Sequence, residues 1–411
     1  MKSTMSVLAI NGGNKTRVKP FTIGAVIGDE ERQRVKEVLD SGCLSGFIAR
    51  AGDHFLGGKQ VKELEALINQ YFGSAYAVTC NSATAALHMA VAALGIGPGD
   101  EVIVTPYSMC ASATAILMTG AIPIFADIDP DTFCLDPQAI KKAITPRTRS
   151  IMVVHLFGKP ADMEAIMQIA RQHKLSVIED CAQAPGALYK GKLAGTFGDI
   201  GVFSLNQNKT ITCGEGGWAI TENAELALRM QLVRNHGEVV AGDMKREGID
   251  DIIGYNYRMT ELEAAVGIGQ FRRLDELNDH RIPLAEHLSK QLDGLPGLTV
   301  PKKEAQERHV YFVYPLKFDE KKAGISRDIF IKALIAEGIP CAGGYVRPIY
   351  WEPLYQKKNH SKGICPVCER MHQKELILLS ACRHPHTLAD MDDVINAVKK
   401  IFNNIQELKN G

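Results

Sequence analysis

The stretch Ser204-Leu-Asn-Gln-Asn-Lys209-Thr-Ile-Thr-Cys-Gly-Glu-Gly-Gly217 places one lysine in a polar turn that ends in a glycine-rich run. The apolar run at residues 200–205 predicts a buried strand, so Lys209 is presented just beyond a strand end. Most surface lysines are solvated charges, and this stretch alone fits that interpretation as well as it fits a lysine held for chemistry. The rest of the chain decides between the two.

Short apolar segments alternate with helical segments on both sides of this stretch. Near-continuous apolar strands joined by helices indicate a mainly parallel sheet, here of seven strands, with helices on both faces, which is an α/β fold. Ligands of such sheets bind beyond the carboxyl ends of the strands. The expected strands are residues 75–79, 101–105, 122–126, 150–155, 175–179, 200–205 and 218–221, and the helices between them are residues 82–94, 110–119, 137–143 and 161–173.

The ends of the chain differ from this alternating region. Residues 1–25 show no strong periodicity and are expected to form an arm, and residues 26–275 are expected to form a large domain that contains two early helices at 30–39 and 61–72. Residues 276–411 are expected to form a smaller α+β domain. Its strand is predicted at 309–317 and its helices at 327–337 and 388–408.

Composition excludes several classes of partner. The chain has 411 residues, and its 47 lysines and arginines balance its 47 aspartates and glutamates, so no basic field favours nucleic acid or an anionic membrane. No run of about 18 apolar residues and no signal-like segment occurs. Ten cysteines in a chain of this length indicate buried thiols in a reducing compartment. A cytoplasmic enzyme with a small-molecule ligand is the expectation.

Two motifs at other strand ends are suited to binding. Cys80-Asn-Ser-Ala-Thr84 leads into a helix, where free N–H groups and the hydroxyls of Ser82 and Thr84 suit an anion. An ordinary N-cap by Asn81 or Ser82 explains the same residues. Asp180 ends a buried strand and Gln183 follows it, so the carboxylate needs a cationic or protonated partner there, or it caps the next turn.

One cofactor explains these motifs together with Lys209. Pyridoxal phosphate needs a phosphate site, a carboxylate that keeps its pyridine nitrogen protonated, and a lysine that forms an aldimine. A lysine at the carboxyl edge of a sheet suits that role if its amine stays nucleophilic. The combination is far more specific than its parts, and it predicts a pyridoxal-phosphate enzyme with Lys209 and Asp180 as catalytic residues.

A series of motifs then points to a known family. In chain order they are Ser82-Ala-Thr-Ala-Ala-Leu-His88, Gly95-Ile-Gly-Pro-Gly-Asp-Glu-Val102, Ile178-Glu-Asp-Cys-Ala-Gln-Ala184, Phe197-Gly-Asp-Ile-Gly-Val-Phe-Ser204, Lys209 with Gly214-Glu-Gly-Gly217, Arg234-Asn-His-Gly237 and Gly254-Tyr-Asn-Tyr-Arg-Met-Thr260. With these motifs the chain resembles the DegT family of sugar aminotransferases from about residue 20 to about residue 401. This resemblance implies a fold-type-I homodimer that acts on a nucleotide-linked keto-sugar or on a keto-cyclitol, with glutamate or glutamine as the amino donor.

The resemblance also implies a role for individual residues. Lys209 is similar to the aldimine lysine, Asp180 to the partner of the pyridine nitrogen and Gln183 to the residue that binds the ring hydroxyl. The phosphate cup is implied at Ala83, Thr84 and Ser204, beside Ser82. Asn256 and Arg258 match the segment that reaches into the partner subunit's site, so composite active sites are implied.

Two positions depart from the family pattern. Ala83 stands where the family usually has glycine, so we expect the backbone there to be helical enough to accept a β-carbon. Met109 stands where the family stacks an aromatic residue on the cofactor ring, and a thioether can lie against that ring more softly. Tyr107, two residues earlier, is the alternative ring contact.

The acceptor and a cysteine motif are less determined by the sequence. Tyr345, Arg347, Tyr350 and Trp351 combine an arginine with aromatic side chains, which suits a phosphate, base or sugar, although a structured surface turn explains them equally well. The loop at 41–59 is a second candidate. Cys365-Pro-Val-Cys368 has the spacing of a metal-ligand pair, but no second matching pair follows, so no metal is expected.

The expected function is therefore an aminotransferase. The alternatives are a non-catalytic pyridoxal-phosphate-binding regulatory protein, and a sugar dehydratase or lyase on the same fold. Branches of the fold that dehydrate sugars carry histidine in place of the lysine, so Lys209 argues against the second alternative.

Overall fold

The chain is described here from a computed structural model, which covers residues 7–409 except residues 23, 245, 247, 250 and 358–360. Its central element is a seven-stranded sheet in the order β1-β9-β8-β5-β4-β2-β3. Strand β9 runs antiparallel to both of its neighbours, and the other pairs are parallel. The mainly parallel sheet is thus confirmed. The strands are β1 (Tyr76–Cys80), β2 (Glu101–Val104), β3 (Ile122–Phe125), β4 (Thr148–Val154), β5 (Ser176–Asp180), β8 (Ile200–Ser204) and β9 (Gly217–Thr221).

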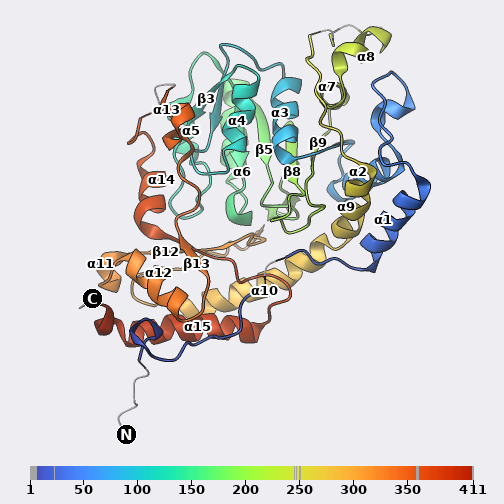
Figure 1. The fold of residues 1–411 in the computed structure, drawn as a ribbon. Coiled ribbons are helices and arrows are strands. Elements are labelled where there is room, and N and C mark those ends of the chain that lie inside the picture. The colour runs from blue at the N-terminus through green and yellow to red at the C-terminus, as the bar shows by residue number, and fades with distance from the viewer. Residues whose placement is uncertain are drawn as a thin grey trace.

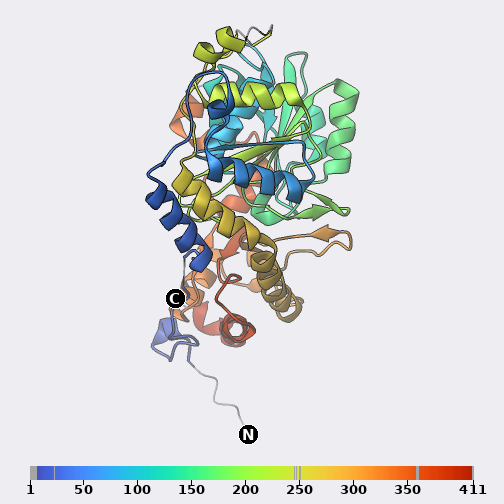
Figure 2. The ribbon, with the colours of Figure 1, turned by 90° about the vertical axis from the view of Figure 1, so that its right-hand side faces the viewer.

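Helices cover both faces of this sheet (Figures 1 and 2). Side chains alternate between the faces of a strand, so Ala219 of β9 joins the large core cluster while Trp218 and Ile220 join a second cluster on the other face. In that second cluster the ring of Trp218 stacks on Phe203 of β8 at 4.8 Å. The helices are α2 (Lys59–Phe72), α3 (Ala83–Ala93), α4 (Ala111–Met118), α5 (Pro137–Ala143), α6 (Met163–His173), α7 (Ala224–Arg234) and α9 (Glu261–Arg272).

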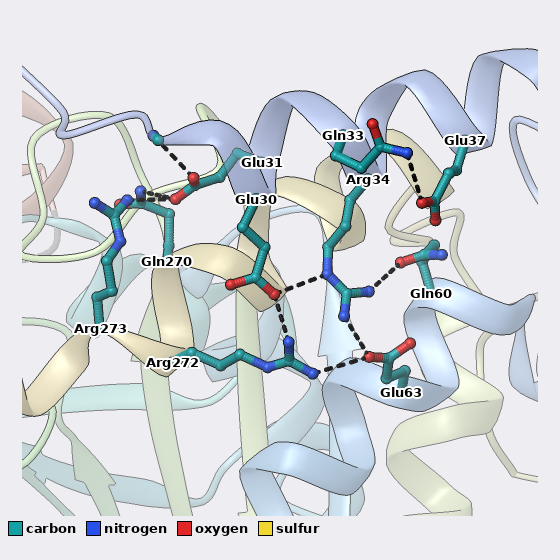
Figure 3. Close-up of polar contacts among 11 residues, drawn as sticks. Glu30, Glu31, Gln33, Arg34, Glu37, Gln60, Glu63, Gln270, Arg272 and Arg273 are labelled. Atoms are coloured by element: carbon teal, nitrogen blue, oxygen red, sulfur yellow. Dashed lines mark hydrogen bonds and ion pairs between the residues drawn. The ribbon is translucent and has the colours of Figure 1, made fainter.

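Helix α1 (Asp29–Ser41) is joined to α9 by a buried polar cluster (Figure 3). Gln270 of α9 donates its amide to Glu31 Oε1 at 2.7 Å, and Arg273 also pairs with that carboxylate. Burial opposes ionisation of Glu31, but hydrogen bonds from Gln270 and from a backbone N–H outweigh it and lower the pKa of the carboxyl. Gln270 Oε1 also accepts the N–H of Thr212 at 3.4 Å, so this cluster supports the turn that follows Lys209.

A second layer lies below the large sheet in Figure 1, linked to it by the long helix α10 (Leu274–Leu292). Its sheet is antiparallel, in the order β10-β12-β14-β13, and α12 (Arg327–Ala336) and α15 (Leu388–Asn403) pack with it around one apolar cluster. The boundary at residues 275 and 276 stays a prediction. The strands are β10 (Leu298–Thr299), β12 (Tyr314–Phe318), β13 (Cys341–Gly343) and β14 (Leu376–Leu379).

The strand and helix limits differ from the sequence in a few places. The strand expected at 309–317 begins only at Tyr314, because Tyr311 has a positive φ of 45° that an extended strand does not allow. The terminal helix ends at Asn403, before a 3-10 turn at Ile405–Leu408. The remaining elements are α8 (Gly237–Met244), α11 (Glu320–Ala323), α13 (Pro353–Gln356), α14 (Pro366–Arg370) and the small sheet of β6 (Leu188–Tyr189), β7 (Lys192–Leu193) and β11 (Glu307–Arg308).

The N-terminal segment packs on this second layer. Leu8 is fully buried in its apolar cluster, and the buried carboxylate of Glu337 accepts the N–H groups of Ala9 and Thr16. Residues 1–6 and 23 of the expected arm lie outside the described residues. Among the helices that the structure describes, none is long and apolar enough to cross a membrane.

Candidate active site

One cavity of about 520 Å³ opens at the carboxyl edge of the large sheet. Strands β5 and β8 end there at Asp180 and Ser204, and β1 ends just before the turn into α3. Parallel strands bring such ends to one edge, so residues far apart in sequence meet. Of the residues proposed from the sequence, the cavity is lined by Ser82, Ala83, Thr84, Met109, Asp180, Gln183, Ser204, Lys209 and Tyr345.

The first turn of α3 presents backbone donors to this cavity. Ser82 is the N-cap, and its Oγ accepts the N–H of Ala85 at 3.1 Å, while its carbonyl accepts the N–H of Ala86 at 3.0 Å. The N–H groups of Ala83 and Thr84 precede those two and have no acceptor within the helix, because the first amides of any helix lack one. Ser82 therefore caps the helix, and because its oxygen is the acceptor in that bond, its hydroxyl proton remains available; anion binding by Ser82 stays a prediction.

Gly217 allows the sheet to approach this helix start. It pairs with Cys80 of β1 and Ser204 of β8. A Cβ at Gly217 would lie 2.6 Å from the nitrogen of Ala83, closer than real contacts allow. Only glycine therefore fits beside the start of α3, and we call this start, with the donors around it, the cradle. The β-carbon of Ala83 is accepted because Ala83 is already the first helical residue.

Ser204 supplies a second hydroxyl to the same cavity. Its Oγ accepts the N–H of Asn206 at 3.2 Å, so its own proton is free to donate. The side-chain amide of Asn206 in turn donates to Glu215 at 3.0 Å. Two hydroxyls and two helix amides thus converge, which is the donor set that a phosphate dianion prefers.

Lys209 places its amine in the same cavity, near Asp180. Burial lowers the pKa of the amine, and the negative charge of Asp180 partly offsets that effect. Nζ also lies 4.8 Å from the ring centre of Phe312, which comes from the loop before β12. A lowered pKa leaves more of the amine unprotonated, as a nucleophilic or proton-moving lysine requires.

The amide of Gln183 has a defined orientation. Gln183 Oε1 accepts the N–H of Phe157 at 2.8 Å, and because that N–H can only donate, the amide NH2 must point the other way. The NH2 group donates to the hydroxyl of Tyr345 at 3.1 Å and keeps a second proton for the cavity. Gln183 is therefore suited to bind an acceptor atom such as a ring oxygen.

With this geometry in view, comparison with known proteins identifies the family. Residues 26–399 match the model of the DegT/DnrJ/EryC1/StrS aminotransferase family. The chain belongs to this family. It is similar to GDP-perosamine synthase of Caulobacter vibrioides, with 38% identity over 90% of this chain and 95% of that protein. It is also similar to L-glutamine:scyllo-inosose aminotransferase of Streptomyces griseus, with 34% identity over 98% and 99%.

Solved structures agree with this assignment. DesV of S. venezuelae, solved in complex with a ketimine intermediate, superposes with a TM-score of 0.80 and 33% identity over 91% of this chain and 94% of that one. The protein is therefore an enzyme of the aminotransferase class with the fold-type-I architecture, and both expectations from the sequence are confirmed. The individual site residues remain proposals that rest on the geometry above.

Met109, the residue to which the resemblance assigns the ring contact, lines the cavity. Met109 is 55% exposed and lines the cavity, so its thioether is free to lie against a ligand ring. Tyr107 is fully buried and does not line the cavity; its hydroxyl accepts the N–H of Tyr345 at 2.8 Å. Of the two alternatives, the position of Met109 fits a ring contact and that of Tyr107 does not.

Asn256 and Arg258 lie outside the cavity of their own chain. Arg258 Nε donates to Asn256 Oδ1 at 2.8 Å, and Asn256 is exposed. Arg258 Nη1 also reaches Asn235 Oδ1 at 3.4 Å. The family resemblance assigns these residues to the partner's site, and their outward position leaves them available for that role.

The four residues proposed for the acceptor separate into two groups. Tyr345 lines the cavity. Arg347 does not line it, but its side chain is exposed and makes only a loose contact of 3.8 Å to Glu352, so it is available to a ligand. Tyr350 and Trp351 do not line the cavity: they are buried, and the hydroxyl of Tyr350 donates to Glu369. We therefore carry only Tyr345 and Arg347 forward as acceptor residues.

The cysteine motif is part of the core. Cys365 and Cys368 are fully buried, and burial raises the pKa of both thiols. Asp127 accepts the N–H groups of Val367 and Cys368 and so caps α14. Buried thiols with raised pKa values are poor metal ligands, because binding requires the thiolate.

A second group with metal-ligand geometry, His155, Glu179 and Cys181, is also fully buried. His155 Nδ1 accepts the N–H of Ala161, so Nε2 carries the proton and donates to Glu179 at 2.9 Å. The two oxygens of Glu179 accept four hydrogen bonds in all, including three from backbone N–H groups at residues 195, 197 and 198. These bonds use the lone pairs that a metal would need, so we assign the group to the core.

Several residues of the cavity wall escaped the sequence analysis. Phe312 comes from the second layer, and Asn206 and Glu215 flank Lys209. Ser112 of α4 was missed as well; it does not line the cavity itself, but it donates a hydrogen bond to Asp180, which does. None of them belongs to a spacing pattern that the sequence alone reveals. Asn206 and Glu215 belong to the stretch of residues 204–217, so their closeness to Lys209 in the sequence was the one signal that could have indicated a place in the site.

Proposed function

We propose that the protein is a pyridoxal-phosphate-dependent aminotransferase that moves an amino group from glutamate or glutamine to a nucleotide-linked keto-sugar or to a keto-cyclitol. The observation that carries this proposal is the convergence of Lys209, Asp180 and the start of α3, against which Gly217 packs, at one cavity. In this cavity the donors of the cradle suit a phosphate, Asp180 suits a pyridine nitrogen and Lys209 suits an aldehyde carbon. The names of the relatives support a sugar or cyclitol acceptor.

The residues present fit the cofactor, and each has a distinct task. When bound, pyridoxal phosphate supplies an aldehyde that captures amines and a ring that accepts the electron pair left by a departing proton. Ser82, Ser204 and the amides of Ala83 and Thr84 bind the phosphate. Asp180 holds a proton on the ring nitrogen through its negative charge.

Lys209 has two tasks in this proposal. Its Nζ would hold the cofactor between turnovers, and once free as an amine it would accept the proton that leaves the donor's α-carbon and return it later in the transfer. Gln183 donates its remaining amide proton to the ring hydroxyl. Met109 lies against the ring, and Tyr345 and Arg347 contact the acceptor.

The test follows the cofactor by absorbance. Purified protein loaded with pyridoxal phosphate receives glutamate or glutamine, and we expect the visible band of the lysine-linked cofactor to disappear as a 2-oxo acid forms. A panel of nucleotide-linked keto-sugars, free keto-sugars and keto-cyclitols is then tested for compounds that restore the visible band. If no amino acid removes the band, the non-catalytic alternative holds; if a sugar loses water instead of gaining nitrogen, the dehydratase alternative holds.

We also propose a homodimer with composite active sites. The exposed Asn256 and the half-buried Arg258 support it, because neither residue lines the cavity of its own chain. Subunits that carry Lys209→Ala and subunits that carry Arg258→Ala are each expected to be inactive. Exchange between the two is expected to restore activity, since one site in each mixed dimer is then intact. No recovery after proven exchange would contradict the composite site.

A further inference from the structure

The first turn of α4 brings a buried hydroxyl to the carboxylate of Asp180. Ser112 is fully buried, and its Oγ donates to Asp180 Oδ2 at 2.8 Å. We propose that Ser112 is a positioning residue whose hydroxyl holds the carboxylate of Asp180 and directs it into the cavity. This inference rests on the proposed function, because it concerns the task of Asp180 toward the bound cofactor.

The hydrogen bonds of Asp180 define how the carboxylate is held. Only 4% of the residue is exposed, so water supplies little of the solvation that the charge needs. Oδ1 accepts the N–H of Ala182 at 3.1 Å, and Oδ2 accepts the Ser112 hydroxyl. Each oxygen has a second lone pair, and these remain for a donor in the cavity such as a protonated ring nitrogen.

The Ser112 proton has one preferred acceptor. Ser112 Oγ also lies 3.3 Å from Ser108 Oγ, but one hydroxyl proton cannot serve two acceptors. Hydrogen bonds to a charged acceptor are shorter and stronger than those between neutral groups, so the proton goes to Asp180. The oxygen of Ser112 can then accept from Ser108, which strengthens the donor further.

The backbone around Ser112 fixes this arrangement. Ser112 is the second residue of α4, and the N–H groups of Ala113 and Thr114 close the first turn on the carbonyl of Cys110. The positive end of the helix dipole therefore lies next to the carboxylate, and it favours the same charged form as the hydroxyl does. Replacing Ser112 by alanine removes one donor without altering any residue of the cavity lining, since Ser112 itself does not line it.

The expected effect is on cofactor binding. Loss of a hydrogen bond to a charged group weakens pyridoxal-phosphate binding in Ser112→Ala by between about tenfold and a hundredfold. A cofactor analogue with carbon in place of the pyridine nitrogen is expected to bind Ser112→Ala and the unchanged protein equally. In an Asp180→Asn background, Ser112→Ala is expected to have no further effect, because there is no charge left to support.

The matched control is Ser150→Ala. Ser150 is also a fully buried serine that makes one hydrogen bond, to the carbonyl of Ser176 at 3.0 Å, but it lies at the opposite end of β4 from the cavity. Its replacement is expected to leave cofactor affinity unchanged. Ser112→Thr keeps the hydroxyl and is expected to bind nearly as well as the unchanged protein, whereas Ser112→Cys is expected to bind like the alanine variant.

The experiment is a titration of each purified apoprotein with pyridoxal phosphate and with the analogue, with circular dichroism to establish folding. If Ser112→Ala does not fold, the comparison of Ser112→Thr with Ser112→Cys decides. The inference would be overturned if the unchanged protein, Ser112→Ala and Ser112→Cys bound pyridoxal phosphate with equal affinity. It would also be overturned if Ser112→Ala lost as much affinity for the analogue as for pyridoxal phosphate, or if Ser112→Ala weakened binding as strongly in the Asp180→Asn background. Failure of the unchanged protein to bind pyridoxal phosphate would instead overturn the proposed function.

Discussion

Gly217→Ala tests whether the cradle beside α3 binds a phosphate. The added Cβ would lie 2.6 Å from the nitrogen and 2.9 Å from the Cα of Ala83, and 2.7 Å from the carbonyl carbon of Ser82. All three are backbone atoms, so no flexible side chain can move aside. To reach ordinary contact at 3.4 Å, strand and helix must separate by about 0.8 Å.

That separation acts on the donors of the cradle. A displacement of about 1 Å at a site of this kind costs up to about a hundredfold, so we expect pyridoxal phosphate to bind Gly217→Ala between about tenfold and a hundredfold more weakly. Pyridoxal, which lacks the phosphate, is expected to bind with nearly unchanged affinity. Overpacking is also expected to lower the free energy of unfolding by about 1–3 kcal/mol.

The assay is a fluorescence or absorbance titration of the folded apoprotein with both ligands. Gly242→Ala is the control, because nothing lies within 4 Å of a Cβ built at that position in α8. It is expected to change neither affinity. The reasoning would be refuted if Gly217→Ala bound pyridoxal phosphate as tightly as the unchanged protein does, or if pyridoxal lost affinity to the same extent.

Two further predictions concern stability. The pKa of Glu31 is lowered in the folded protein, so the contribution of this carboxylate to the free energy of unfolding is present above its usual pKa of 4.5 and is lost as the pH falls through its folded pKa. Glu31→Gln is expected to flatten this pH dependence of stability, measured by urea titrations at several pH values. An unchanged pH dependence would contradict the role of the cluster with Gln270. Tyr350→Phe removes the buried hydroxyl that donates to Glu369, so we expect the free energy of unfolding to fall by about 1–3 kcal/mol while the KM for the acceptor stays unchanged. A changed KM with unchanged stability would instead show that Tyr350 contacts the acceptor.

Sequence patterns located the strands and the edge of the sheet well. Mainly apolar runs of four to six residues placed the seven strands within about two residues of their ends, because strands buried on both faces are rich in apolar residues. The rule that ligands bind at the carboxyl edge then grouped Ser82, Asp180 and Lys209 before any geometry was available, and the cavity brings them together.

Side-chain direction in loops was beyond the reach of the sequence. Tyr345 and Tyr350 belong to one aromatic stretch, yet Tyr345 faces the cavity while Tyr350 packs against Phe125 at 5.6 Å. No periodicity governs an irregular segment, so nothing in the residue types separates the two. Ser112 and Phe312 were missed for a related reason: their contacts join elements that only the packing of the chain brings together.

The central claim, that Lys209 is the residue that carries pyridoxal phosphate, has a direct test. The holoenzyme is treated with borohydride, which makes the linkage permanent, and its peptides are mapped by mass spectrometry. The account predicts that the peptide that contains Lys209 carries the added cofactor mass. In Lys209→Ala it predicts that neither the added mass nor the visible band is present. A stable cofactor mass on any other lysine, or a visible band that persists in Lys209→Ala, would contradict it.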